Sequence, residues 1–183
     1  MSGTVGGVMD LLAPVPSGDR PLAQTALDRL AAAPAEIGSH SRRMIMMARA
    51  LAGDRPVDQA LLVAACAVHD LGLLSGTAQR WPRLGFPDRS AAVLAELAEH
   101  HGLARDRSDP WCWAIAGHLR PLAPAGETTE ASLLRRAAWL DAGGVGSRAD
   151  RAVVRRLELS RSTPQTARLL ARVGAACARD LIR

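Results

Sequence analysis

Lysine is missing from this sequence, and aromatic residues are scarce. All 23 basic residues are arginines, and with 18 acidic residues they give a net charge of +5. The arginines are spread along the chain without interleaved aromatic residues, so they do not indicate a nucleic-acid-binding surface. Complete replacement of lysine by arginine is more typical of base-composition bias in a gene than of a particular function.

Cysteines are few, and long apolar runs are absent. Cys66, Cys112 and Cys177 are widely spaced among apolar neighbours, which is the pattern of neither a disulfide framework nor a zinc motif. No low-charge apolar run reaches the roughly 18 residues that a membrane span needs. The first residues have no basic segment ahead of an apolar block, as a signal peptide would. We therefore expect a cytoplasmic protein that does not enter a membrane.

The residues that are abundant favour helices. Hydrophobic residues make up 48% of the chain, and alanine and leucine dominate them, which favours closely packed helices over sheets. No segment alternates like a surface strand. The sequence therefore predicts an all-α fold of about seven or eight helices. It also predicts one domain over residues 21–183, preceded by a loosely ordered segment at residues 1–20.

Capping and breaking residues give approximate bounds for these helices. Asp58 is a predicted N-cap, and residues 75–85, rich in glycine and proline, are predicted to be a loop that could cover a site. The predicted helices begin at Pro21, after Gly38–Ser39, at Val57, at Pro87, at Asp109–Pro110, at Thr128 or Thr129, at Ala149 and at Pro164.

A His-Asp pair at the end of an apolar run is the most informative feature. His69 and Asp70 follow the run that begins at Ala60, while His40 and Asp141 lie in predicted helices on either side. Buried imidazole and carboxylate groups need partners or a metal. Two nitrogen and two oxygen ligands suit Zn, Fe or Mn better than Mg or Ca. Adjacent helical residues project about 100° apart, so His69 and Asp70 can share an ion only near a helix end.

Three segments resemble a known family. They are Ser39–Ser41 around His40, Ala67–Leu73 around His69 and Asp70, and Trp139–Gly146 around Asp141. In this order they resemble successive motifs of the HD-domain superfamily of metal hydrolases, over about residues 36–160. The resemblance implies an HD-type helical bundle in which His40, His69, Asp70 and Asp141 bind a divalent metal. Zinc is favoured, with iron and manganese as alternatives.

Departures from the family pattern indicate which branch of the family this sequence resembles most. Leu73 stands where phosphodiesterase members often carry a lysine that would offset phosphate charge. Phe86 stands where two-metal members carry an extra histidine, so we expect one metal. The segment from Trp113 to His118, with the other motifs, is most similar to the cyanamide hydratase branch, whose members add water to a small nitrile-like substrate at a zinc site.

Several residues have more than one interpretation. His118 could be a ligand, a general acid or base, or a structural histidine at a helix end. Arg43, one turn after His40, could contact an anionic substrate or face solvent. Phe86 and Trp113 could form the walls of a small apolar pocket, or simply belong to the core.

The combined expectation is an enzyme that uses metal-activated water on a small molecule. The catalytic residues would be Asp70 and His118, and the substrate-binding residues Phe86, Trp113 and Arg43. One alternative is a nucleotide or phosphomonoester phosphohydrolase, and another is a non-catalytic HD module that binds a ligand. We expect a small-molecule substrate, no nucleic acid and no membrane partner, and the sequence leaves a homo-oligomer open.

Overall fold

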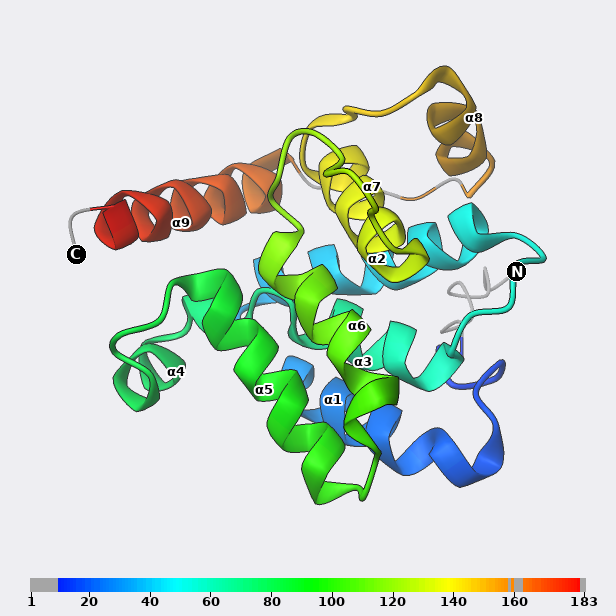
Figure 1. The fold of residues 1–183 in the computed structure, drawn as a ribbon. Helices are drawn as coiled ribbons and strands as arrows, with labels where there is room; N and C mark the ends of the chain where they lie inside the picture. The colour runs from blue at the N-terminus through cyan, green and yellow to red at the C-terminus, as the bar shows by residue number, and fades with distance from the viewer. Residues whose placement is uncertain (1–9, 158, 160–162, 182–183) are drawn as a thin grey trace, which may run out of the picture.

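The protein is a bundle of helices (Figure 1). The computed structural model describes residues 10–157, 159 and 163–181, and in this part of the chain the regular structure is helical throughout, which confirms the all-α class. The α-helices are α1 (Arg20–Ala31), α2 (Ala35–Ala52), α3 (Gln59–Val68), α4 (Ser75–Arg80), α5 (Phe86–His100), α6 (Arg105–Gly117), α7 (Thr129–Gly143), α8 (Arg148–Arg156) and α9 (Thr163–Leu181). Two 3₁₀ helices are η1 (Ser17–Asp19) and η2 (Leu71–Leu73).

Helix ends with a clear chemical signal lie where the sequence predicts them. The Asp58 side chain accepts a hydrogen bond of 3.0 Å from the Leu61 amide and caps α3. Thr128 caps α7 in the same way, and Gly144 ends that helix in the left-handed region with φ 66°. The side chains of Asp58 and Thr128 thus fix the starts of α3 and α7, the two helices that lead into two of the predicted site segments.

Three boundaries differ from the prediction. Helix α2 begins at Ala35, directly after Pro34, so Gly38 and Ser39 lie inside it. The predicted loop at 75–85 contains the short helix α4. Helix α6 begins at Arg105 and includes Pro110. The carbonyl that loses its amide partner there belongs to Asp106, which is exposed, so water can replace the missing bond.

Helix α3 lies at the centre of the bundle. Every residue from Ala60 to Val68 is buried, and α1, α2, α5 and α6 pack around this helix. A helix that is apolar on all sides is stable only when it is enclosed in this way. None of the described helices is both long enough and apolar enough to cross a bilayer. His69 and Asp70 therefore lie at the carboxyl end of the most buried helix, and both are buried themselves.

Gly72 fixes the turn that follows the His-Asp pair. Its amide donates to the Ser90 hydroxyl at 2.8 Å, and its carbonyl accepts from the Arg89 guanidinium at 3.0 Å. A Cβ at this position would collide with the Phe86 carbonyl oxygen. The glycine thus allows η2 to lie against the start of α5, and this close contact holds Asp70 in place.

Part of the segment predicted to be loose is packed against the domain. Residues 1–9 of that segment lie outside the described residues, but Val15 is buried in the core. Arg107 joins this segment to α3 through ion pairs with Asp19 at 2.7 Å and Asp58 at 2.6 Å. Residues 10–19 therefore belong to the folded unit, because Val15 is buried and the guanidinium groups of Arg107 and Arg49 bind Asp19 and the Leu11 carbonyl.

Candidate metal centre

Three of the four predicted metal ligands lie together in the interior. His40 comes from the second turn of α2, His69 is the C-cap of α3, and Asp70 follows it. All three are buried, and their ligand atoms lie within 4.8 Å of one another. The His40 Nε2 is 3.1 Å from the His69 Nε2 and 3.7 Å from an Asp70 oxygen. The helix end between His69 and Asp70 lets both side chains reach one point.

The hydrogen bonds of the two histidines involve their Nδ1 atoms, so both Nε2 atoms are available to bind a cation. The His69 Nδ1 donates to the Cys66 carbonyl at 2.9 Å, and the His40 Nδ1 donates to Asp141 at 2.6 Å. A neutral imidazole with its proton on Nδ1 presents a lone pair at Nε2. Metal-binding histidines almost always donate their other nitrogen to a carbonyl or carboxylate in this way. The arrangement therefore fits a divalent metal between the two rings.

Asp70 supplies the third feature that fits a metal. One of its carboxylate oxygens, Oδ1, is buried and has no hydrogen-bond partner among the described residues. Burial favours the neutral acid, but the nearby imidazoles of His69, His118 and His40 together outweigh it and hold the pKa of Asp70 well below its ordinary value. A buried anionic oxygen without a partner is costly unless a cation compensates it.

The two histidines respond differently to their surroundings. Burial lowers the pKa of His40, so this ring is neutral. Burial also opposes the cationic form of His69, but the neighbouring Asp70 carboxylate reverses the effect and raises the pKa of that ring. Without a metal, a proton on His69 can occupy the space between the two Nε2 atoms. A divalent cation would displace that proton, as metals do when they bind ionisable ligands.

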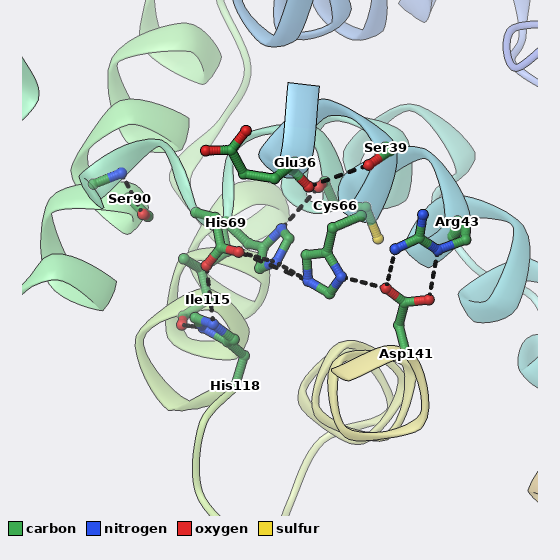
Figure 2. Close-up of polar contacts among 12 residues, drawn as sticks. Glu36, Ser39, Arg43, Cys66, His69, Ser90, Ile115, His118 and Asp141 are labelled. Carbon is green, nitrogen blue, oxygen red and sulfur yellow. Dashed lines mark hydrogen bonds and ion pairs between the residues drawn. The ribbon is translucent and has the colours of Figure 1, made fainter. Parts of the chain in front are cut away.

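Asp141, the fourth predicted ligand, lies outside this cluster and beside Arg43 (Figure 2). It projects from α7 and accepts from Arg43 through both oxygens, at 2.7 and 2.8 Å, and also from the His40 Nδ1. These bonds from His40 and Arg43 overcome the effect of burial and lower the pKa of Asp141 to about 2. Arg43 was expected to contact a substrate or to face solvent; instead it is buried and holds this carboxylate.

His118 lies beside the cluster on its open side. It is the C-cap of α6, it is buried, and its Nε2 is 3.6 Å from Asp70 Oδ1. Its Nδ1 donates to the Ile115 carbonyl at 2.6 Å, which fixes the ring (Figure 2). The Phe86 ring is fully buried 6.1 Å from the His118 ring and packs edge-on to it. Phe86 therefore supports His118 from behind.

A small cavity opens onto the cluster. It has a volume of about 110 Å³. Its walls are His40, Asp70, His118, Leu119, Ala138, Trp139, Ala142, Leu169, Leu170 and Val173. The expectation that Trp113 forms a wall is wrong, because this side chain is 71% exposed. Trp139, one helix away in α7, takes that place.

The cavity walls that α9 contributes are not predicted by the sequence. Leu169, Val173 and Ala176 recur at intervals of four and three residues, which marks one apolar helix face. That pattern predicts a helix with one face packed against the rest of the protein. It does not indicate that the face reaches a site whose histidines lie 50 to 130 residues earlier in the chain.

The comparison with known families agrees with the order and the geometry of these residues. The model of the HD domain matches residues 37–143. The chain belongs to the HD-domain family. The match spans His40, His69, Asp70, His118 and Asp141 and leaves α8 and α9 outside. Family membership and the buried His-His-Asp cluster together indicate a metal-dependent hydrolase. Searches of curated proteins and of solved structures gave no significant match.

Proposed function

We propose that this HD domain uses metal-activated water to hydrolyse or hydrate a small, uncharged molecule. The observation that carries the proposal is the convergence of two histidine Nε2 atoms and an Asp70 oxygen without a hydrogen-bond partner, beside a small cavity that His40 and Asp70 line. A divalent metal held there would lower the pKa of bound water from 15.7 to about 7 and so supply hydroxide at neutral pH. The nitrogen and oxygen donors favour zinc, with iron or manganese as alternatives.

The residues around the cluster have distinct tasks in this proposal. His40, His69 and Asp70 hold the metal. Asp141 fixes the tautomer and direction of His40, and Arg43 fixes Asp141. This replaces the ligand role that the family resemblance implied for Asp141. Orienting carboxylates of this kind typically change metal affinity by 10- to 100-fold.

His118 is suited to move a proton. Its Nδ1 proton is committed to the Ile115 carbonyl, so the Nε2 that lines the cavity can accept a proton from water beside Asp70. The same atom can return that proton to a nitrogen or oxygen of the substrate. A positioned histidine of this kind typically contributes 10²- to 10⁴-fold to the rate.

The nature of the cavity favours addition of water to a nitrile-like or other C–N substrate. The polar groups among the described residues that line it are the two histidines, Asp70 and the indole of Trp139. The other lining residues are apolar. The resemblance of the Trp113–His118 and Trp139–Gly146 segments to the cyanamide hydratase branch agrees with this substrate class. A buried cluster of three intact ligands, His40, His69 and Asp70, argues against a non-catalytic ligand-binding module.

Phosphoester hydrolysis is the second candidate, because HD domains are typically metal-dependent phosphohydrolases. A phosphate needs cationic or amide donors around its oxygens. None of the described residues that line the cavity is an arginine, and Arg43 is already committed to Asp141. Leu73 occupies the position at which many phosphodiesterase members carry a lysine. These observations place phosphoesters second.

The test combines metal analysis with a substrate panel on one preparation. The chain is loaded with zinc, iron or manganese, and hydrolysis or hydration of cyanamide, short nitriles and nucleoside monophosphates is measured. We expect one metal per chain and turnover confined to the C–N substrates, with both lost in Asp70→Ala. Turnover of nucleotides at about 1 per second or faster would promote the phosphohydrolase. A chain that binds no metal after supplementation would overturn the proposal.

A further inference from the structure

Helix α9 contributes to the cavity although it lies outside the part of the chain that matches the HD domain. The family match ends at residue 143, whereas α9 spans Thr163–Leu181. Leu169, Leu170 and Val173 from this helix line the same cavity as His40, Asp70 and His118. A feature common to the family therefore supplies the chemistry, and an element outside the matched region supplies part of the binding surface.

The inner face of α9 is built into the core. Leu169 is only 3% exposed and belongs to the main hydrophobic core, and Ala176, two turns later, is fully buried. Val173 lies between them and is half-buried, while Arg168, Ala171 and Ala175 on the outer face are exposed. This division means that the helix has a fixed rotation, with Val173 directed at the cavity.

Polar contacts fix α9 along its length to the elements that surround the site. Near its start, Gln165 pairs with Ser39 at 3.2 Å, next to the metal-binding His40. In its middle, Arg172 donates to Glu36 at 2.7 Å. Near its end, Asp180 accepts from the Phe86 amide at 2.8 Å. The helix is thus attached to both α2 and α5, and its distance from the cluster is set.

The cavity is sized for a group of a few heavy atoms. A water occupies about 30 Å³ in the liquid, and an apolar cavity of about 150 Å³ binds benzene or xenon. The 110 Å³ found here lies between these two cases. A charged or strongly polar group pressed against Leu169 and Val173 would lose its hydration without a replacement, whereas an alkyl group would not.

We propose that α9 is the selectivity wall of this enzyme, and that Leu169, Leu170 and Val173 accept a short, uncharged alkyl or similar apolar group of the substrate. The inference rests on the proposed function for its catalytic meaning, since the wall faces the metal cluster. Leu170, which is 47% exposed, lies at the outer end of this wall. A charged group against the buried Leu169 part of the wall is disfavoured by desolvation, and a bulky group by the small volume of the cavity.

Straight-chain hydroxamic acids test the wall in the metal-loaded protein, because the hydroxamate group chelates the metal while the alkyl chain probes the cavity. Affinities of acetohydroxamic to hexanohydroxamic acid are measured by calorimetry. We expect affinity to rise about fourfold per methylene until the cavity is full and then to fall. Val173→Phe should weaken butyrohydroxamic acid at least tenfold and leave acetohydroxamic acid within about twofold, while Val173→Ala should move the optimum to a longer chain.

Ala171→Phe is the matched control, because it adds the same ring to the exposed face of the same helix. This variant should reproduce the wild-type series. Equal effects of the two phenylalanine substitutions, or an affinity that does not depend on chain length, would overturn the selectivity wall. Thermal melting shows whether each variant is folded. If Val173→Phe does not fold, Val173→Ala still tests the wall, because it should enlarge the cavity instead of filling it.

A second probe separates failure of the wall from failure of the proposed function. Xenon binds apolar cavities without a metal, and its binding is followed by ¹²⁹Xe NMR in the metal-free chain. We expect a bound-xenon shift in the wild type and in Ala171→Phe that Val173→Phe removes. A chain that takes up no metal but shows this pattern would refute the proposed function and keep the wall. Xenon binding unaffected by Val173→Phe would refute the wall.

Discussion

At the scale of single residues, the metal centre depends on which nitrogen of each histidine is occupied. His40, His69 and His118 each donate Nδ1 to an oxygen, and each therefore presents Nε2 to one side of Asp70. The acceptors are a carboxylate for His40 and backbone carbonyls for the other two. This common orientation accounts for the cluster, because three rings with mixed tautomers would repel a cation at one nitrogen or another.

The first prediction separates the two aspartates. Asp70→Asn should abolish tight metal binding, because it removes the anionic ligand. Asp141→Asn should weaken metal affinity by about 10- to 100-fold and leave the stoichiometry at one, since it only loosens the orientation of His40. Both are measured by competition with a chromophoric chelator. If Asp141→Asn loses the metal as completely as Asp70→Asn, then Asp141 is a ligand, as the family resemblance implied.

The second prediction concerns His118. We expect His118→Ala to lower turnover by about 10²- to 10⁴-fold with metal content unchanged, because its Nε2 faces the cavity and not the centre of the cluster. Kinetics and metal content are determined on the same sample. Loss of the metal together with activity would make His118 a ligand, and retention of both would make it structural.

At the scale of secondary-structure elements, the site is assembled where helix ends meet. The carboxyl end of α3, the turn η2 and the start of α5 contact one another through Gly72, and α6 ends at His118. The last carbonyls of a helix have no amide partner within it. Here His69 donates to one such carbonyl at the end of α3, and His118 donates to one at the end of α6. The same bonds that finish these helices thus orient the rings.

The third prediction tests the contact at Gly72. Gly72→Ala should destabilise the fold by about 1–3 kcal/mol, because the added methyl group would force η2 away from the Phe86 carbonyl. It should also weaken metal binding, since Asp70 precedes this turn. Gly76→Ala is the control: a Cβ there meets no atom within 4 Å, so in α4 it should be neutral or stabilise by up to about 1 kcal/mol. Urea denaturation compares the two; equal stabilities would contradict the account of Gly72.

The fourth prediction concerns how α8 is held against α7. Asp150 of α8 is buried and accepts from both arms of the Arg136 guanidinium, and these hydrogen bonds lower the pKa of its carboxyl below 3.8. Because the folded pKa is depressed, the stabilisation is complete above about pH 3.8 and is lost as the pH falls below it. Asp150→Ala should cost about 1–3 kcal/mol at pH 7 and markedly less at pH 3. Urea denaturation at both pH values measures this, and a cost independent of pH would contradict it.

The elements also show how far the sequence predicts the structure. Asp58, Thr128 and Gly144 mark helix ends because a cap is a local interaction between near neighbours. Pro110 led to a wrong prediction for the start of α6. Proline has no amide hydrogen to donate within a helix, but the carbonyl that lacks this bond can accept a hydrogen bond from water instead. In the site, the pattern of His40, His69 and Asp70 is readable from order alone. The position of Asp141 behind His40 is not, since it depends on Arg43, 98 residues away.

At the scale of the whole molecule, the bundle brings distant segments to one buried point. His40 comes from α2 and His69 from the end of the central helix α3, and Asp70 contacts both. Separating any of these helices would destroy the cluster, so a metal ion can bind tightly only to the assembled bundle. Metal affinity and the stability of the entire domain are therefore linked.

The last prediction follows from that linkage. At a free zinc concentration of 100 times the dissociation constant, a metal that binds only the folded chain stabilises it by about 2.7 kcal/mol. For a chain of 183 residues this corresponds to a rise in melting temperature of about 5–10 °C. A chelator should reverse the rise, and manganese at equal concentration should give a smaller one because it binds nitrogen ligands more weakly. Asp70→Ala should show no rise, since it lacks the anionic ligand. An equal rise in Asp70→Ala would mean that the zinc binds elsewhere.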